Sequence, residues 1–426
     1  MQLNRYRVYI KYCFQGILLI FLATVADAQV GNVIYVHDPS IIKVDGDYYI
    51  FSTGYGYGIP MRRSGNLYDW QWGGSVFNAI PAWAKQAVPG VNSLWAPDIS
   101  YRDSTFYLYY SVSTFGSNRS CIGLATNTTL NPDDPDYAWV DQGEVICSNY
   151  WNNWNAIDPN LVEDDSGRVW LAFGSFWSGI KMRQLDPETM KPDSANTKLY
   201  SLARRPSNNA IEAPFIIRKY GYYYLFASID YCCNGSESTY KVIVGRSSEV
   251  TGPYVDRSGN EMLNGGGTLL LSSTNRWRGP GHNSVLLDST GDWIVYHAYD
   301  AQNNGRPTLH IRSLNWTEDQ WPTVGDWVQL ETEPVTMNPT DFTLFPNYPN
   351  PFNLSTRIGY ELPRPVQVNI SIYDIRGRLV TNLVNERMDA GYHTVVWEGN
   401  SVSSGVYFYR LTAGEFTSIR KMILVK

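Results

Sequence analysis

The sequence contains few charged residues and has no basic excess. Charged side chains make up 17% of the 426 residues, and the formal net charge is -6. Nucleic acids are bound by basic surfaces that neutralise their phosphates, so this composition argues against a nucleic-acid partner. Long helical periodicity is also absent, and no segment of the mature chain is apolar for long enough to span a membrane. We expect a soluble, strand-rich monomer.

Cysteine is scarce too, and no Cys-x-x-Cys or Cys/His spacing points to a zinc site. Four cysteines lie beyond the N-terminal region, namely Cys121, Cys147, Cys232 and Cys233. An even number in an exported protein permits disulfides but does not define their pairing. Because Cys232 and Cys233 are adjacent, a bond between them would be strained, and we expect two unpaired, half-buried thiols there.

The N-terminus has the features of an export signal. Basic residues precede a mostly apolar run from Cys13 to Val25, and the small residues Ala26 and Ala28 occupy the cleavage positions. The run is too short to cross a membrane comfortably. We therefore predict a signal peptide over residues 1–28 and a mature chain that begins near Gln29.

Aromatic residues are abundant, with 31 Tyr and 15 Trp. Such residues suit strands, and their faces also suit stacking on sugar rings. One pattern recurs five times: a polar residue near a Pro, a short apolar strand, a tight turn and an aromatic strand. Its markers are Asp38, Asp98, Asp158, Glu212 and His282, which are spaced 60, 60, 54 and 70 residues apart. The aromatic strands are expected at 48–53, 106–112, 169–173, 222–227 and 293–299.

Strand–turn–strand units at regular spacing indicate antiparallel sheets, and small sheets repeated around an axis form a propeller. We predict an all-β fold in which residues 29–335 form a five-bladed β-propeller. A sandwich or a β-helix is the alternative, although these intervals are too long for β-helix coils. In a propeller the innermost strand of each blade begins near the axis, so the residues that begin the units should meet at one mouth.

Asp38, Asp158 and Glu212 occupy three of these five starts, and His282 occupies a fourth. A buried charge must be paired or neutralised, so three carboxylates around one funnel indicate a functional site. Glycoside hydrolysis needs an acid that protonates the leaving oxygen and a base that activates water, and a third carboxylate can raise the pKa of the acid. Asp98 lies two residues beyond its equivalent start and is expected to be structural.

Five motifs carry a resemblance to a known family: Val36-His37-Asp38-Pro39-Ser40, Leu94-Trp95-Ala96-Pro97-Asp98, Asn155-Ala156-Ile157-Asp158-Pro159, Ile211-Glu212-Ala213-Pro214 and Gly279-Pro280-Gly281-His282-Asn283-Ser284. In this order they resemble the successive motifs of glycoside hydrolase family 43, most closely its endo-α-1,5-L-arabinanases. The resemblance covers roughly residues 31 to 335.

The resemblance implies an inverting hydrolase with Asp38 as the general base and Glu212 as the general acid. Asp158 would tune the pKa of the acid and orient it. An inverting pair leaves room for water, so the carboxyl groups of Asp38 and Glu212 should lie roughly 6.5–9.5 Å apart. The resemblance also implies a metal ion, usually calcium, held in the axial channel by His282 and waters, although calcium prefers oxygen ligands.

The substrate contacts follow from position. Trp95, directly before its blade start, is expected to stack on an arabinose ring, and Phe115, Asn155 and Ser175 are expected to face the mouth. The Cys232-Cys233 loop should border the cleft, and such a pair is also found in arabinanases.

A second unit follows a linker at residues 336–341. Alternating short strands and turn signals over residues 342–426 predict a small immunoglobulin-like β-sandwich. Its Asn347–Asn353 run, its Tyr373–Arg378 turn and its Lys421–Lys426 tail resemble the C-terminal sorting domain of the type IX secretion system. The resemblance implies export across both membranes with the outer-membrane secretion machinery as a partner, and a secreted or surface-held product. A plain accessory or carbohydrate-binding sandwich is the alternative.

Endo-hydrolysis of α-1,5-linked arabinan, a pectin side chain of plant cell walls, is the favoured hypothesis. An exo-acting α-L-arabinofuranosidase or β-xylosidase would use the same carboxylates in a pocket closed at one end. A retaining fructan hydrolase would hold its paired carboxyls only about 5–5.5 Å apart. A sugar-binding propeller without catalysis belongs to a different class and would need no acid or base.

Overall fold

The computed structural model describes residues 33, 35–54, 58–328, 341–347, 350–400 and 402–425. The predicted signal peptide and residues 336–340 of the predicted linker lie outside these described residues. Among the described helices, none combines the length and the apolar character that a membrane crossing requires.

Between residues 33 and 328, the described chain forms five antiparallel sheets, each built from four strands that are consecutive in sequence. The first sheet contains Ser40–Val44 (β1), Asp47–Phe51 (β2), Pro60–Ser64 (β3) and Gln71–Ser75 (β4). The second contains Leu94–Arg102 (β5), Thr105–Val112 (β6), Ser120–Asn127 (β7) and Val140–Ser148 (β8). The third contains Asn160–Glu163 (β9), Val169–Phe173 (β10), Ile180–Leu185 (β11) and Tyr200–Ala203 (β12).

The fourth sheet contains Ile211–Lys219 (β13), Tyr222–Ile229 (β14), Lys241–Ser247 (β15) and Thr268–Leu271 (β16). The fifth contains Trp277–Asp288 (β17), Gly291–Asp300 (β18), Arg306–Trp316 (β19) and Pro322–Trp327 (β20). The described helices are short: Ala82–Ala87 (α1) and the 3-10 turns Gly235–Glu237 (η1), Met262–Asn264 (η2) and Ala301–Asn303 (η3). The five aromatic strands predicted from the repeat are confirmed as β2, β6, β10, β14 and β18.

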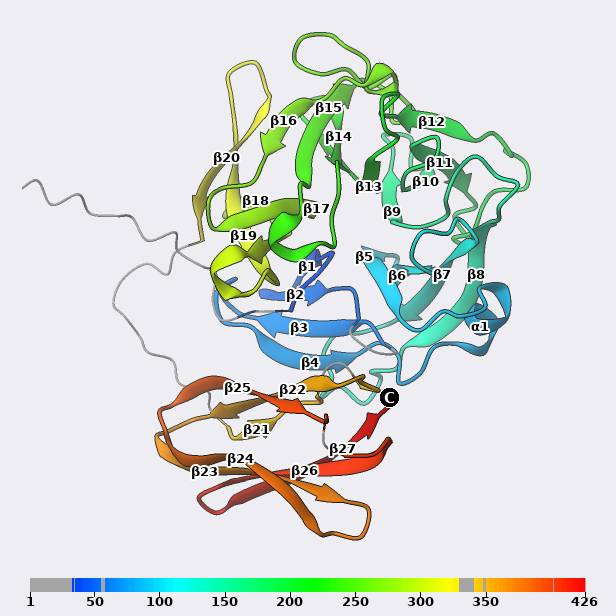
Figure 1. Cartoon of the computed structure of the whole chain (residues 1–426). Coiled ribbons are helices and arrows are strands. Elements are labelled where there is room, and N and C mark those ends of the chain that lie inside the picture. Colours follow the sequence, from blue (N-terminus) through cyan, green and yellow to red (C-terminus); the bar gives the residue numbers. More distant parts are fainter. Residues whose placement is uncertain are drawn as a thin grey trace, which may run out of the picture.

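The sheets surround a common centre, with β1, β5, β9, β13 and β17 innermost (Figure 1). The outermost strands were not predicted because they carry no clear alternation; β4, for example, reads Gln-Trp-Gly-Gly-Ser and has no buried residue. Apolar clusters fill the space between neighbouring sheets. One of them joins the last sheet to the first, bringing Val295 and Ile311 against Ile41 and Ile50.

The N-terminal segment also joins the last sheet to the first. The Tyr35 amide donates to the Pro307 carbonyl at 2.8 Å, and the Leu309 amide donates to the Val33 carbonyl at 3.2 Å. The last sheet is therefore joined to the first by backbone hydrogen bonds as well as by apolar contact.

Residues 341–425 form the second domain from two facing sheets. One contains Thr343–Leu344 (β21), Ser355–Leu362 (β22) and Gly391–Glu398 (β25). The other contains Leu379–Met388 (β24), Val366–Asp374 (β23), Gly405–Ala413 (β26) and Phe416–Leu424 (β27). A buried cluster lies between them and includes Tyr360, Trp397, Ile370 and Tyr409. The domain lies beside the first sheet (Figure 1). Its Arg357 Nη1 donates to the hydroxyl of Tyr35, in the segment that precedes β1, at 2.8 Å.

The β9–β10 turn shows how one side chain fixes a hairpin. Asp164 accepts hydrogen bonds from the Ser166 hydroxyl, from Arg168 Nε at 2.7 Å and from Trp170 Nε1 at 2.9 Å. Burial alone would raise the pKa of Asp164, but these hydrogen bonds outweigh it and lower the pKa from 3.8 to about 2. The ionised carboxylate is therefore the form that the turn stabilises.

Asp164→Asn should destabilise the folded chain near neutral pH by about 2 kcal/mol. Because the folded pKa lies below the unfolded value, this contribution is complete above pH 3.8 and disappears as the pH falls towards about 2. Urea unfolding followed by tryptophan fluorescence at pH 7 and pH 2.5 measures the difference. Asp165→Asn is the matched control because the Asp165 side chain is exposed and pairs with Arg218 at the surface; an equal loss in both variants at pH 7 would contradict the assignment.

Candidate active site

Each innermost strand has one residue in the left-handed region of backbone space, either just before the strand (β1 and β9) or at a register shift within it (β5, β13 and β17), and we call this residue the entry of the strand. These residues are Asp38 (φ 52°), Ala96 (φ 42°), Asp158 (φ 57°), Ala213 (φ 55°) and His282 (φ 48°). In β5, β13 and β17 the pairing register shifts at the same place, which marks a β-bulge. In the first four cases a proline follows, and its missing N–H is tolerated at a bulge or strand start.

The backbone N–H of each of these five residues donates to a side chain of the preceding sheet. The acceptors are His297 Nδ1 for Asp38, Thr53 Oγ1 for Ala96, Ser111 Oγ for Asp158, Asp158 Oδ2 for Ala213 and Ser228 Oγ for His282, at 2.8–3.1 Å. A buried N–H without a partner is costly, so these bonds fix the position of each of the five residues relative to the preceding sheet. Side chains at the five entries therefore meet at the centre.

The structure corrects one sequence assignment. The fourth entry is Ala213, and Glu212 precedes it by one residue. Asp98 lies two residues after the second entry, as expected. Its carboxylate accepts from the Leu161 amide at 2.7 Å and from Asn160 Nδ2 at 3.2 Å, which ties the second sheet to the third. Burial raises the pKa of Asp98 to about 7, and its role here is structural.

Asp38 is surrounded by imidazoles. Its Oδ1 lies 2.8 Å from His37 Nδ1, 3.1 Å from His282 Nδ1 and 3.7 Å from His297 Nδ1. The Thr53 hydroxyl donates to its Oδ2. Burial would raise the pKa of Asp38, but His37 and His282 outweigh it and hold the pKa well below its usual value. Asp38 is therefore ionised at neutral pH.

The other two carboxylates contact the third and fourth sheets. Glu212 Oε1 accepts from the Tyr240 hydroxyl at 2.5 Å, and its Oε2 accepts from the Ser175 hydroxyl at 2.6 Å. Asp158 Oδ2 accepts from the Ala213 amide, directly beside Glu212. Burial, with the charges of Glu212 and Asp38 adding to it, raises the pKa of Asp158 to about 8. The cluster therefore holds a proton at neutral pH.

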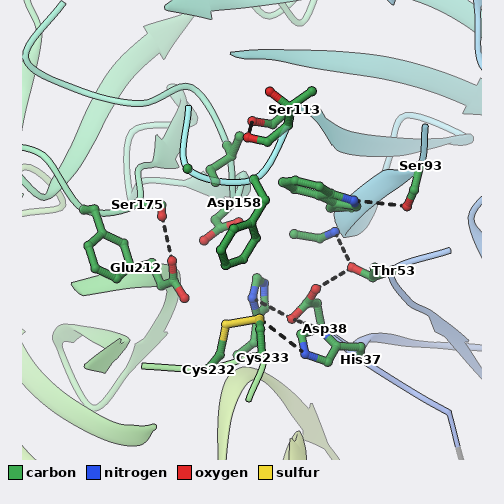
Figure 2. A pocket seen from close by; sticks show the side chains of 18 of the residues that line it. His37, Asp38, Thr53, Ser93, Ser113, Asp158, Ser175, Glu212, Cys232 and Cys233 are labelled. Atoms are coloured by element: carbon green, nitrogen blue, oxygen red, sulfur yellow. Dashed lines mark hydrogen bonds and ion pairs between the residues drawn. A yellow bond between two sulfur atoms is a disulfide. The ribbon is translucent and has the colours of Figure 1, made fainter. Parts of the chain in front are cut away.

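These groups line one cavity of about 1210 Å³. Figure 2 shows Asp38, Asp158 and Glu212 around a common space, with Ser175 beside Glu212 and Thr53 beside Asp38. The cavity is also lined by His282 and by the four expected substrate contacts, Trp95, Phe115, Asn155 and Ser175. Two residues of the second domain, Asn350 and Pro351, line it as well.

The expectation of two free thiols at this cavity is wrong. Cys232 and Cys233 form a disulfide that lines the cavity wall (Figure 2), and Cys121 and Cys147 form a second disulfide between β7 and β8. Cys233 is in the left-handed backbone region, an arrangement that the sequence does not reveal. Its amide donates to the Tyr299 hydroxyl at 2.8 Å.

The sequence analysis also missed several residues that contact the carboxylates. His37 stood in a quoted motif but was given no role, Thr53 and His297 lay within predicted aromatic strands, and Tyr240 lies directly before β15. The one available signal was His297, a polar residue in the otherwise apolar Ile294–Ala298 stretch. Nothing in the sequence distinguishes Tyr240 from the other 30 tyrosines.

A metal site can be tested against these side chains. His282 Nδ1 faces Asp38, which leaves Nε2 as the nitrogen available to an ion. Next to it, both amide atoms of Asn283 are buried without a hydrogen-bond partner among the described residues. Burial would lower the pKa of His282, but Asp38 and the other carboxylates raise it to about 9, so the site favours positive charge. These features fit a hydrated cation held by one imidazole.

Comparison with known proteins agrees with this geometry. Residues 32–322 match the model of Glycosyl hydrolases family 43, and residues 347–426 match the Secretion system C-terminal sorting domain. An extracellular endo-α-(1→5)-L-arabinanase of Bacillus subtilis is 47% identical over 67% of this chain and 87% of its own. An extracellular exo-α-(1→5)-L-arabinofuranosidase of Cellvibrio japonicus is 44% identical over 68% of this chain and 86% of its own.

Among solved structures, the endo-arabinanase of Bacillus licheniformis is 49% identical, with a TM-score of 0.65 over 69% of this chain and 99% of its own. This chain belongs to glycoside hydrolase family 43, with a β-propeller catalytic domain. Its C-terminal sorting domain marks it for export by the type IX secretion system.

Tyr240→Phe should lower kcat for the hydrolysis of arabinan, the substrate that the relatives' names indicate, by roughly tenfold or more with little change in KM. The substitution removes the hydroxyl that holds Glu212 Oε1, so the carboxyl can leave its working orientation. The control is Tyr254→Phe, which removes a buried hydroxyl bonded to the Val250 carbonyl. If both variants lose activity equally, Tyr240 contributes only to stability and not to positioning.

Proposed function

We propose that this protein hydrolyses α-1,5-linked arabinan with inversion of anomeric configuration, cutting within the chain. The observation that carries the proposal is the convergence of Asp38, Asp158 and Glu212 in one cavity, in a chain whose relatives are named for this substrate. Hydrolysis with inversion requires a base that activates water and an acid that protonates the leaving oxygen.

Asp38 is the general base. Its pKa is held well below the usual value by His37 and His282, so it is ionised and able to accept a proton from water. The water would attack the anomeric carbon from the side opposite the leaving group. The carboxyl groups of Asp38 and Glu212 should then lie about 6.5–9.5 Å apart, which stays a prediction.

Glu212 is the general acid, and Asp158 tunes and orients it. Tyr240 and Ser175 hold one oxygen each of the Glu212 carboxyl. Asp158 holds the neighbouring Ala213 amide, so a change in Asp158 moves the backbone that carries the acid. As the bond breaks, Glu212 gives its proton to the leaving sugar oxygen, and the proton taken from water stays on Asp38.

Sugar contacts come from the second and third sheets. Asn155 is only 2% exposed, lines the cavity, and has an Oδ1 without a hydrogen-bond partner among the described residues. A substrate hydroxyl would satisfy this buried acceptor. Trp95 and Phe115 provide aromatic faces for the apolar faces of arabinose rings.

The size of the cavity favours endo action. Its volume of about 1210 Å³ exceeds the roughly 300–1,000 Å³ that is typical of pockets for single small ligands. The second candidate is exo action, which Asn350 and Pro351 favour because they line the same cavity and could obstruct one end of it. One of the compared relatives is exo-acting, and another is endo-acting.

The proposal includes calcium in the axial channel, with His282 as its protein ligand and waters completing its shell. Such an ion would supply positive charge beside the carboxylates.

We further propose that the five sheets are the blades of a five-bladed propeller, and that the second domain is immunoglobulin-like. Support for these comes from the cluster that joins the fifth sheet to the first and from the two facing sheets of residues 341–425.

Debranched arabinan is the substrate that tests the proposal. Endo action predicts viscosity loss well ahead of reducing-end release, and NMR of the first products should show inverted anomers. Asp38→Asn and Glu212→Gln should each lower kcat by at least about a thousandfold. Release of arabinose alone would favour the exo candidate, and retained configuration would exclude the inverting roles. Running the assay on the whole chain and on a chain ending at Val328 shows whether Asn350 and Pro351 obstruct the cavity.

Metal content gives an independent test of the channel site. Elemental analysis of purified protein, dialysed against chelator and then against calcium, should find one calcium per chain. His282→Ala should lose this equivalent because the only imidazole proposed as a ligand is gone. His310→Ala serves as the control, since His310 is fully buried against Trp277 and Tyr296 in the fifth sheet. Equal calcium in wild type and His282→Ala would contradict the assignment.

A further inference from the structure

The three aromatic side chains that are most exposed in the described residues lie on one part of the surface. Phe115 is 85% exposed, Trp151 83% and Tyr150 70%. Phe115 lies in the loop between β6 and β7, and the other two lie in the loop that leads from β8 to β9. Single exposed apolar residues are common, but a group of three large ones on neighbouring loops marks a binding surface.

Both loops lie at the cavity end of the second sheet. β5 starts there, since Trp95 and Ala96 stand at its entry, and antiparallel pairing then returns β6 and β8 to the same end. Phe115 lines the cavity, and so does Asn155, four residues after Trp151. The Tyr150–Trp151 pair is thus close in sequence to Asn155, a cavity residue, and lies on a loop next to the one that carries Phe115.

The two loops are locked together. The Asn118 side chain is 5% exposed, and its amide donates to the carbonyls of Asn149 and Asn152, at 2.9 Å each. The Ser148 hydroxyl donates to the Asn118 carbonyl at 2.7 Å. These hydrogen bonds connect the two loops directly beside Tyr150 and Trp151. The backbone that carries the exposed rings is therefore fixed.

The loop is also held from within, and the rings touch one another. The Trp151 amide donates to Asn149 Oδ1 at 2.9 Å, and the Asn149 amide donates to Asn152 Oδ1 at 2.9 Å. The Tyr150 and Trp151 ring centroids lie 4.7 Å apart at 47°. The pair forms one bent aromatic surface. Because the loop is already ordered in the free protein, a ligand that binds there loses little conformational entropy by ordering it.

We propose that Tyr150 and Trp151 form an accessory site that binds arabinan beyond the cavity, where a chain passing Phe115 would next make contact. The proposal rests on the proposed function. Sugar rings present C–H faces that pack on aromatic rings while their hydroxyls stay in water. The net charge of -6 favours a neutral polysaccharide over an acidic pectin backbone.

The test compares a long substrate with a short one. The double variant Tyr150→Ala/Trp151→Ala should lose about five- to tenfold in kcat/KM on debranched arabinan, the size expected for lost ring stacking. Its kcat/KM on arabinotetraose, which we expect to be too short to reach Tyr150 and Trp151 from the cavity, should stay unchanged. Tyr101→Ala is the matched control, because Tyr101 is 55% exposed and stands near the opposite end of β5; it should match wild type on both substrates.

A binding assay separates the accessory site from catalysis. In a Glu212→Gln background, migration in native gels that contain debranched arabinan should be retarded, and the double variant should reduce this retardation. Gels that contain xylan or polygalacturonate should show little effect. The proposal is overturned if the double variant loses kcat/KM equally on arabinan and arabinotetraose, or loses none on arabinan. It is also overturned if xylan retards the protein as much as arabinan does. If wild type cleaves neither arabinan nor arabinotetraose, the proposed function fails, and the gels still report on the accessory site.

Discussion

The active site depends on one repeated interaction: the N–H of a left-handed residue at the entry of each innermost strand bonds to a side chain of the preceding sheet. Left-handed backbone costs a non-glycine residue roughly 1–3 kcal/mol, and an unpaired buried N–H would add to that cost. The hydrogen bond offsets part of the strain and removes the penalty. It also sets the position of each entry relative to its neighbour, so the centre is held by five such links.

The left-handed entry residue recurs in all five sheets, but its side chain differs from sheet to sheet. Asp38, Asp158 and His282 place functional groups at the entry itself, whereas Ala96 and Ala213 place none. At the fourth sheet the carboxylate stands one residue earlier, on Glu212. Ser175 follows β10 at the position where Thr53 follows β2. The Thr53 hydroxyl accepts a backbone N–H, from Ala96, whereas the Ser175 hydroxyl donates to the Glu212 carboxylate. The Ala213 amide instead takes Asp158 as its acceptor, so a proposed catalytic group also serves as a structural link.

The repeat made much of this arrangement predictable from the sequence. Aromatic strands recur with turn residues and Asp-Pro or Ala-Pro pairs, and these fix the innermost two strands of each sheet. The one-residue offset of Glu212 was not visible, because both Glu212-Ala213-Pro214 and Asp158-Pro159 satisfy the pattern of an acid near a proline. Tyr240 and the Cys232–Cys233 bond were out of reach for a different reason: each depends on a contact or loop conformation that no periodicity records. The outermost strands were missed because partial exposure removes their apolar alternation.

Charge compensation explains how so many ionisable groups can share one buried centre. Asp38 is ionised, while His282, with its pKa raised to about 9, carries the balancing proton. His297 stays neutral, since burial holds its pKa well below the usual value and its Nδ1 accepts the Asp38 amide. Asp158 is protonated near neutral pH. The positive charge beside Asp38 comes from a proton on His282, and the proposed cation would have the same effect on the pKa of Asp38. The pairing that makes the buried charge of Asp38 tolerable thus also keeps this residue ionised, as the role of general base proposed for it requires.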